Sequence, residues 1–149
     1  MDEYWTEFEA GHARQIIESN GRPQEAWCDA NFSDRWCKSL EDRIWAYTLM
    51  VNGIPVACVG LVLQDLGKAE AWTLFSNSFQ NHVLTIYRLI KTGLKMAFHE
   101  KNLSRIQATI DPSYPATVKW IESLGFEYEG RLRKYGPLGQ DFLMYARTN

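Results

Sequence analysis

The run from Asp111 to Phe126 constrains the fold of this chain more than any other stretch of its 149 residues. Pro112 and Pro115 lack an amide hydrogen and have a fixed φ, so they belong in a turn or in the first turn of a helix. After them, four apolar residues recur at helical spacing, namely Val118, Trp120, Ile121 and Leu124. Gly125 can end such a helix in a left-handed conformation. The run therefore predicts a strand end, a turn, a short helix over 116–124 and a new strand from Phe126.

With Glu129 and Gly130 behind it, the run resembles a segment of GNAT-type N-acetyltransferases. The family pattern is Asp-Pro-x-Asn-x-Ala-Ser-x-Arg-hydrophobic-Leu-Glu-x-Leu-Gly-Phe-x-x-Glu-Gly, and the match is best to the branch that acetylates ribosomal proteins and small-molecule amines. The resemblance covers about residues 44–147. It implies an α/β (α+β) fold of GNAT type, in which helices flank a mixed, mostly antiparallel sheet.

The rest of the chain predicts the element order that this fold requires. Asn52-Gly53 between two apolar runs is a strong hairpin signal, because both residues tolerate positive φ. The predicted helices are 7–19, 23–40, 80–99 and 116–124, and the predicted strands are 44–51, 55–63, 69–75, 105–110, 126–134 and 141–147. In the helix 80–99, Arg88, Lys91 and Lys95 face away from an apolar stripe. We expect one domain over 1–149, helical in 1–43, with the sheet and the CoA-binding core in 44–149.

Composition narrows the class of protein. A net charge of −2 and a pI near 5.9 argue against a nucleic-acid-binding module, which normally carries a basic surface. The three cysteines and three histidines show neither disulfide nor metal-ligand spacing, so we expect reduced thiols and no metal. The apolar runs fall short of the roughly 20 residues that span a bilayer, and the chain opens with acidic residues. A soluble, cytoplasmic protein without a membrane partner is expected.

The resemblance implies a site for the co-substrate acetyl-CoA at the end of strand 69–75. In the family, a loop of pattern Arg/Gln-x-x-Gly-x-Gly/Ala follows that strand, and its amides and the next helix N-terminus bind the pyrophosphate. The loop here, 76–83, contains no glycine. Either the loop still presents amides to the pyrophosphate, helped by Ser78, Asn81 and the helix dipole, or the acetyl-CoA site is lost. The alternative for Asn81 is a plain helix cap with no role in binding. The implied cofactor residues are Leu74, Phe75, Ser76, Asn77, Ser78, Asn81, His82, Val83 and Thr117.

Acetyl transfer needs a polarised thioester carbonyl, a base for the amine proton and an acid for the departing thiolate. The resemblance assigns the first role to the backbone amide of Leu74 or Phe75 and the role of base to Glu70. Side-chain alternation puts Glu70 on the same strand face as Trp72 and Leu74. The alternative for Glu70 is an exposed carboxylate near a strand end, with no catalytic role.

Other polar residues are candidates for the remaining roles. Tyr114 stands where the family has an asparagine near the sulfur, so it is either the general acid or a surface turn residue. Tyr128 and Tyr135 are further candidates for the acid, although packing explains both. Glu41 and Asp42 are weaker candidates for the base.

We therefore expect an N-acetyltransferase that moves an acetyl group from acetyl-CoA to a primary amine by direct attack in a ternary complex. The alternative is a catalytically inactive GNAT-fold protein that binds partners or belongs to a phage virion. It is favoured by the glycine-free loop and by a looser similarity to the bacteriophage family of podophage internal virion protein A. The residues do not distinguish a protein amine from a small-molecule amine, and a homodimer stays open.

Overall fold

The structure is a computed structural model that describes residues 2–19, 37, 45–113, 115–136 and 138–149. Its centre is a seven-stranded sheet with the strand order β1-β2-β3-β4-β5-β7-β6. The strands are β1 (Glu3–Glu7), β2 (Trp45–Val51), β3 (Ile54–Asp65), β4 (Lys68–Phe75), β5 (Arg105–Ile110), β6 (Glu127–Leu132) and β7 (Phe142–Thr148). The helices are α1 (Ala10–Ser19), the 3-10 helix η1 (Phe79–His82), α4 (Val83–Glu100) and α5 (Pro115–Ser123). This is the mixed, mostly antiparallel sheet flanked by helices that the sequence predicts.

Strands β1 to β4 form the first arm of the sheet, and every neighbouring pair in it is antiparallel. The turn between β2 and β3 is Asn52-Gly53, whose φ angles of 52° and 77° lie in the left-handed region. Asparagine and glycine adopt that region at low cost. The predicted hairpin is therefore confirmed.

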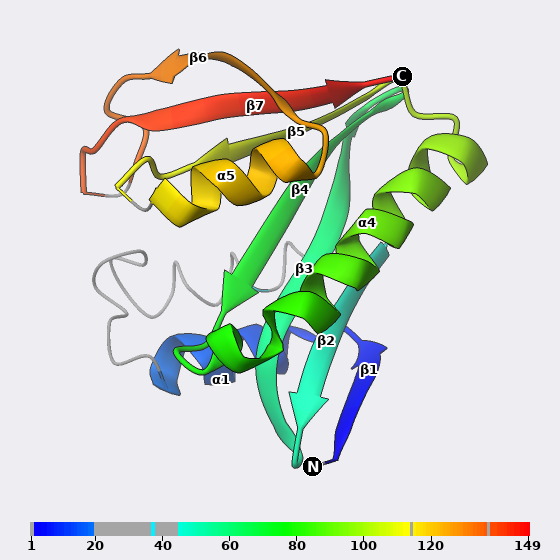
Figure 1. Cartoon of the computed structure of the whole chain (residues 1–149), viewed down its shortest axis with the longest axis vertical. Coiled ribbons are helices and arrows are strands. Elements are labelled where there is room, and N and C mark those ends of the chain that lie inside the picture. Colours follow the sequence, from blue (N-terminus) through cyan, green and yellow to red (C-terminus); the bar gives the residue numbers. More distant parts are fainter. Residues whose placement is uncertain (1, 20–36, 38–44, 114, 137) are drawn as a thin grey trace.

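Strands β5, β7 and β6 form the second arm, which joins the first through β4 and β5 alone (Figure 1). These two strands are parallel and pair at three positions: Lys68 with Arg105, Ala69 with Ile106 and Glu70 with Gln107. Among the described residues the pairing stops there, although β4 continues to Phe75 and β5 to Ile110. The two arms part like a fork, so after Glu70 none of the strands in the described part of the chain lies beside that edge of β4.

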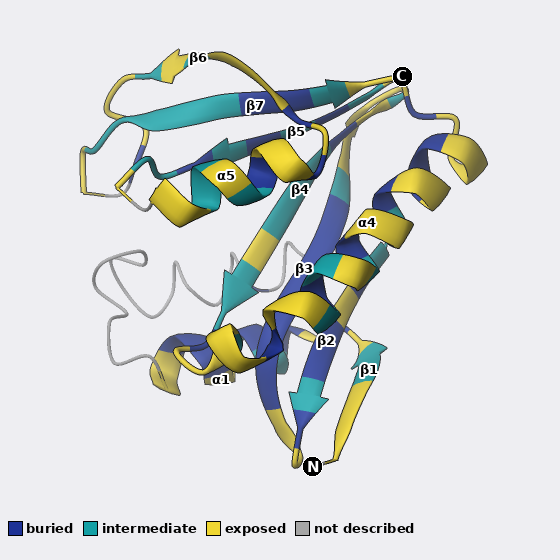
Figure 2. Cartoon of the chain, in the orientation of Figure 1, coloured by how far each residue is buried: buried dark blue, intermediate teal, exposed yellow. Residues whose placement is uncertain are grey.

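Helices α4 and α5 cover one face of the sheet, and α1 packs on the other (Figure 1). Along β3, Ala57 and Val59 enter the large core under α4 and α5, whereas Cys58 enters a smaller cluster under α1. Figure 2 shows the buried residues concentrated in β2, in β3 and on the inner sides of the helices. The helical stripe predicted for α4 supplies the buried side chains Ile86, Ile90, Leu94 and Ala97.

The N-terminal part differs from its prediction. The sequence predicts a helical part over 1–43 with a helix from Glu7, but the structure has β1 at Glu3–Glu7 and begins α1 at Ala10. The five residues of β1 form a strand because β2 offers them an edge to pair with, and their local sequence carries two glutamates that disfavour strands. The predicted helix over 23–40 lies outside the described residues, apart from the buried Cys37. The other predicted helices and strands are confirmed, with ends shifted by a few residues.

Gly93 on α4 lies against the indole of Trp45 on β2. A Cβ at position 93 would lie 2.5 Å from Cζ2 of Trp45, closer than a side chain tolerates. We expect Gly93→Ala to lower the free energy of unfolding by about 1–3 kcal/mol, because overpacking outweighs the gain of about 1 kcal/mol in helix propensity. Gly11→Ala in α1 is the control, since a Cβ there meets nothing within 4 Å. Urea unfolding measures both variants, and a Gly93→Ala protein as stable as wild type would contradict this packing.

Candidate functional site

Main-chain groups along the open edge of β4 form the first part of the site. The N–H of Ser76 donates to a carbonyl of β3 at 2.8 Å. Main-chain groups alternate between the two edges of a strand, so Leu74 also directs its N–H to β3. Ala71, Thr73 and Phe75 direct theirs to the edge that β5 has left. Of the two amides predicted to polarise a thioester, that of Phe75 therefore faces the fork and that of Leu74 does not.

Glu70 lies at the point where the two arms part. It is the last residue of β4 that pairs with β5, opposite Gln107. Its side chain is half-buried and accepts a hydrogen bond from Nε2 of Gln64 at 2.6 Å. Burial raises the pKa of the Glu70 carboxyl above its ordinary value. A carboxylate with a raised pKa is a better proton acceptor, which suits a general base.

The face of β4 that carries Glu70 is the face the sequence predicts. Trp72 and Leu74 pack against the cluster under α1, whereas Phe75 packs against the core under α4 and α5. Since side chains alternate along a strand, Glu70 lies on the α1 face with Trp72 and Leu74. Its carboxylate and the helices α4 and α5 are thus on opposite faces of the sheet.

The loop after β4 is closed by its own hydrogen bonds. The amide of Ser78 donates to Oγ of Ser76, that of Phe79 to the Ser76 carbonyl, and that of Asn81 to the Ser78 carbonyl. The loop then continues as η1 directly into α4, whose N-cap is His82 and not Asn81. An anion at this loop would lie at the start of a continuous helical segment, and it would not be surrounded by the main-chain amides of a glycine-rich loop.

The carboxylate of Glu3 in β1 lies beside the start of α4. Oε2 of Glu3 is 2.7 Å from Nδ1 of His82, and Oγ1 of Thr85 donates to Oε1 at 3.2 Å. His82 is buried, with 8% of its surface exposed. A negative charge at a helix N-terminus is favourable, because it faces the positive end of the helix dipole. These bonds tie the edge strand β1 to the junction of η1 and α4, and they occupy a side chain that the sequence predicts for cofactor binding.

Three aromatic rings connect the two arms on the face covered by α4 and α5. Phe75, the last residue of β4, stacks on Phe79 with ring centroids 4.8 Å apart. The ring of Trp120 on α5 lies edge-on to Phe75, with centroids 5.9 Å apart and an interplanar angle of 74°. The sequence predicts Trp120 as an apolar helix residue and Phe75 as a cofactor-binding residue, and it assigns no role to Phe79. Their position across the fork could not be found from helical or strand spacing, because it depends on how α5 sits against β4.

The other predicted cofactor residues lie around the loop and on α5. Asn77, Ser78, Asn81 and Val83 are exposed, and Thr117 is half-buried. Oγ of Ser78 lies 2.9 Å from Oγ of Ser76. The segment 75–83 contains neither lysine nor arginine, so a phosphate there would rely on hydroxyl and main-chain groups.

Several predicted catalytic residues are not placed. Tyr114, Glu41 and Asp42 lie outside the described residues. Tyr128 and Tyr135 are exposed, and their rings lie 5.7 Å and 5.5 Å from aromatic neighbours on β7. These contacts agree with the packing role that the sequence offers as the alternative for both tyrosines.

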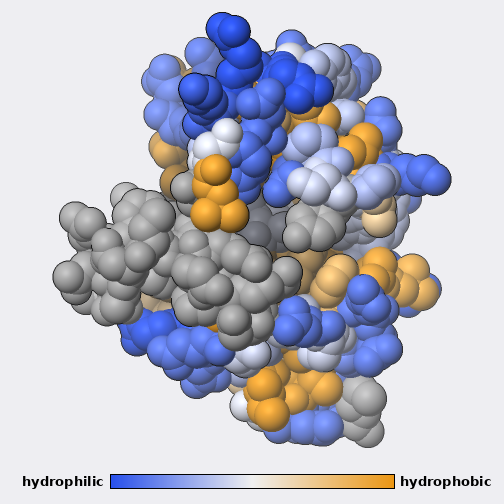
Figure 3. Space-filling view, turned by 90° about the vertical axis from the view of Figure 1, so that its left-hand side faces the viewer, coloured by the Kyte–Doolittle hydropathy of each residue, from blue (hydrophilic) through white to orange (hydrophobic). Residues whose placement is uncertain are grey.

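Figure 3 faces the side on which the arms part. Hydrophilic side chains dominate its upper part, over the arm formed by β5, β7 and β6, and apolar side chains gather in its lower part.

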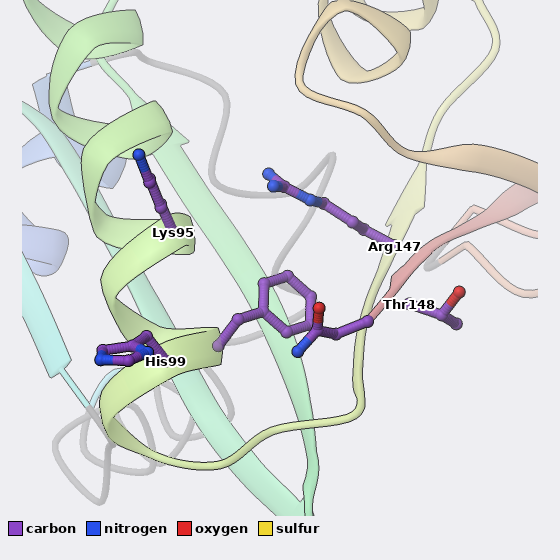
Figure 4. A pocket seen from close by; sticks show the side chains of 6 residues that line it. Lys95, His99, Arg147 and Thr148 are labelled. Atoms are coloured by element: carbon purple, nitrogen blue, oxygen red, sulfur yellow. The ribbon is translucent and has the colours of Figure 1, made fainter.

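A pocket of about 240 Å³ lies elsewhere, between the C-terminal half of α4 and the end of β7 (Figure 4). Its lining includes Lys95 and His99 of α4 and Arg147 of β7. The Arg147 guanidinium lies over the Phe98 ring at 5.2 Å and donates to the Leu124 carbonyl at 3.2 Å. Cationic side chains near a helix C-terminus stabilise the helix dipole. This pocket is next to the start of β5, where the arms are joined, so it is separate from the open edge of β4.

Within the described residues, no group of His, Cys, Asp and Glu side chains is arranged to hold a metal ion. None of the helices in that part of the chain is both long and apolar enough to cross a membrane. Cys37 and Cys58 are buried and are not in a disulfide, and burial raises the pKa of Cys58 to about 12. Cys58 therefore stays protonated near neutral pH and is a poor nucleophile.

Comparisons with known proteins find similarity in the fold and no match in the sequence. No family model matches the chain, and neither does any curated protein. Among solved structures, ribosomal-protein-S5-alanine acetyltransferase from Vibrio fischeri matches with a TM-score of 0.74 and 16% identity, over 100% of this chain and 94% of that one. An acetyltransferase of the GNAT family from Streptococcus pneumoniae matches with a TM-score of 0.73 and 14% identity, over 99% of both chains. A mutant of spermidine N-acetyltransferase from Vibrio cholerae matches with a TM-score of 0.72 and 19% identity, over 97% and 94%.

These likenesses show that the chain has the GNAT fold. The match extends over nearly the whole of each solved chain, so the N-terminal strand and helix belong to the shared fold as well as the sheet and α5. Identities below 20% carry the fold and leave the activity of this chain to be argued from its own residues.

The bonds from Glu3 to the start of α4 should contribute to stability. We expect Glu3→Ala to lower the free energy of unfolding by about 1–2 kcal/mol, because the buried His82 loses its hydrogen-bond partner. Glu7→Ala, at the exposed end of the same strand, is the matched control and should change it by less than about 0.5 kcal/mol. Denaturant melts give both values. Equal effects of the two substitutions would show that the Glu3 contacts contribute no more than an exposed strand residue.

Proposed function

We propose that this chain is an N-acetyltransferase that transfers an acetyl group from acetyl-CoA to a primary amine, by direct attack in a ternary complex. The observation that carries the proposal is the open edge of β4, which presents main-chain groups beyond Glu70 with a half-buried carboxylate at its base. Solved structures with the same fold are named as acetyltransferases of a ribosomal protein and of spermidine. Both of those named substrates are amines.

The open edge of β4 suits the arm of acetyl-CoA. That arm is a narrow chain with two amide groups, and amides pair with a strand edge through the same hydrogen bonds that a neighbouring strand makes. The groups of Ala71, Thr73 and Phe75 that face the fork would hold it. The phosphate-bearing part would lie at the start of α4, near the hydroxyls of Ser76 and Ser78, with Asn77, Asn81, His82, Val83 and Thr117 as the other proposed contacts.

The chain's own residues supply the acid–base and electrostatic steps. Acetyl-CoA brings the activated acetyl group as a thioester. The N–H of Phe75 would stabilise the negative charge that develops on the carbonyl oxygen, because this amide faces the fork. Glu70 would take the proton from the attacking amine, directly or through a water. Tyr114, which directly precedes Pro115 in the sequence, is our proposed donor of the proton to the departing thiolate.

The acceptor is proposed only as a class, a primary amine on a protein or a small molecule. The acidic balance of the chain, with a net charge of −2, is compatible with a cationic acceptor. A cytoplasmic location and a homodimer stay predictions.

The second candidate function is a GNAT-fold protein that has lost catalysis and acts by binding, for instance in a phage virion. One observation favours it: the loop amides of Ser78, Phe79 and Asn81 are bonded within the loop, and the segment 75–83 contains no glycine, lysine or arginine. Binding of acetyl-CoA therefore separates the two functions.

Acetyl-CoA should stabilise the folded chain if the proposal is correct. At a hundredfold excess over its dissociation constant, a ligand that binds only the native state adds about 2–3 kcal/mol to the free energy of unfolding. A thermal-shift titration with acetyl-CoA and with CoA measures this, and ATP at the same concentration is the control for nonspecific binding of phosphates. No shift at millimolar acetyl-CoA or CoA would reject the enzyme and favour the binding protein.

Glu70→Gln should lower turnover by about two to four powers of ten while it leaves acetyl-CoA affinity nearly unchanged, because a general base acts on the amine. The base must be deprotonated to accept a proton. The wild-type rate should therefore fall as the pH drops through the raised pKa of Glu70, and the variant should lose that inflection. Gln64→Leu, which removes only the hydrogen bond to Glu70, is the control with a smaller effect. Wild-type turnover by Glu70→Gln on an accepted amine would place the base elsewhere.

A further inference from the structure

Trp120 lies where the two arms of the fork touch on the face covered by α4 and α5. It comes from α5, which packs on the second arm, and its ring meets Phe75 at the end of the first arm, with centroids 5.9 Å apart. Phe75 is also a residue whose main-chain groups face the open edge of β4. The indole is therefore next to the edge along which we propose that a ligand lies.

The indole N–H of Trp120 is enclosed by protein and has no hydrogen-bond acceptor among the described residues. More than about nine in ten buried polar groups in proteins are paired, because an unpaired buried donor costs as much as a lost hydrogen bond. Phenylalanine would fill an apolar contact with Phe75 without this cost. A tryptophan here is explained if an acceptor arrives from outside the chain.

The proposed ligand carries such an acceptor. Each of the two amides in the arm of acetyl-CoA has a carbonyl oxygen, and an amide that pairs with one strand edge leaves acceptor capacity on its oxygen for a second donor. The ring of Trp120, from α5, meets the ring of Phe75 at the end of β4, so the indole is placed beside a chain that lies along β4.

We propose that Trp120 is a ligand-binding residue whose Nε1–H donates a hydrogen bond to a carbonyl oxygen of the acetyl-CoA arm. This inference rests on the proposed function. The Trp120 hydrogen bond adds a contact from α5 to those from β4. The ligand would thus connect the two arms beyond Glu70, where β4 and β5 are not paired.

Calorimetric titration of acetyl-CoA into Trp120→Phe tests the contact. The variant keeps an aromatic ring against Phe75 and removes only the donor, so we expect affinity about 5- to 30-fold weaker than wild type. Its stability without ligand should be equal or higher, because the unpaired donor is gone. Trp45→Phe, which makes the same change against α4 outside the fork, is the matched control and should bind within about twofold of wild type.

Nuclear magnetic resonance of the protein labelled with ¹⁵N-tryptophan gives a second readout that does not depend on activity. The indole signal of Trp120 is identified by its loss in Trp120→Phe, or by backbone assignment if that variant fails to fold. We expect it to move downfield when acetyl-CoA is added to the wild type, while the Trp45 signal stays in place.

The outcomes separate the two proposals. If wild type does not bind acetyl-CoA, the proposed function fails and the role of Trp120 falls with it. If wild type binds and Trp120→Phe binds equally well with an unmoved Trp120 signal, the function stands and the Trp120 contact is wrong. In that second case the unpaired N–H is a purely structural feature of α5.

Discussion

The three-residue ladder between β4 and β5 is the interaction on which the rest of this structure depends. It holds the two arms together at their base, and the arms part beyond Glu70. Neighbouring strands of a sheet lie about 4.8 Å apart, whereas helices packed side by side need about 8–10 Å. The parting lets α4 cover the first arm and α5 the second on one face of the sheet. The same parting turns main-chain groups of β4 toward the gap between the arms, which is the chemical basis of the proposed site.

Beyond the ladder, side chains connect the two arms. On the face of α4 and α5, Trp120 meets Phe75, and the hydroxyl of Tyr87 on α4 donates to the Ser123 carbonyl at the end of α5. On the opposite face, the carboxylate of Glu70 is held by Gln64 at the base of the fork. A ligand along β4 would thus have a rigid strand on one side and contacts from α5 on the other. Such an arrangement favours binding, because the strand edge is preorganised.

The start of α4 differs from the glycine-rich loop of the family pattern. Hydrogen bonds within 76–81 fold the loop into η1, and Glu3 supplies a carboxylate beside the helix start. The N-terminal strand is therefore part of the wall around the predicted phosphate position. A carboxylate there opposes a second anion by like-charge repulsion, which weighs against the predicted phosphate position.

Local signals in the sequence predicted much of the fold correctly. Asn52-Gly53 specified the hairpin, Gly125 ends α5 with a φ of 89°, and the apolar stripe of α4 matches its buried face. Each of these features depends on the conformational preference of one or two residues or on a repeat within one element. The strand β1 was missed because an edge strand of five residues is stabilised by its partner, and the paired residues lie 40 to 48 positions apart in the sequence.

In the candidate site, too, some features could be predicted from the local sequence and others needed the tertiary structure. Strand alternation placed Glu70 on the correct face of β4, but the choice between the amides of Leu74 and Phe75 needed the hydrogen bond from Ser76 to β3. The contact between Glu3 and His82 joins residues that are distant in sequence. The closed loop and the buried Trp120 N–H, which has no partner among the described residues, depend on exact packing. The sequence by itself determined the order of most elements and the face of the proposed base, because these follow from local periodicity. Only the tertiary structure decided where the arms part and which groups face the gap, because those follow from the pairing of β4 with β5 and the packing of α5 against β4.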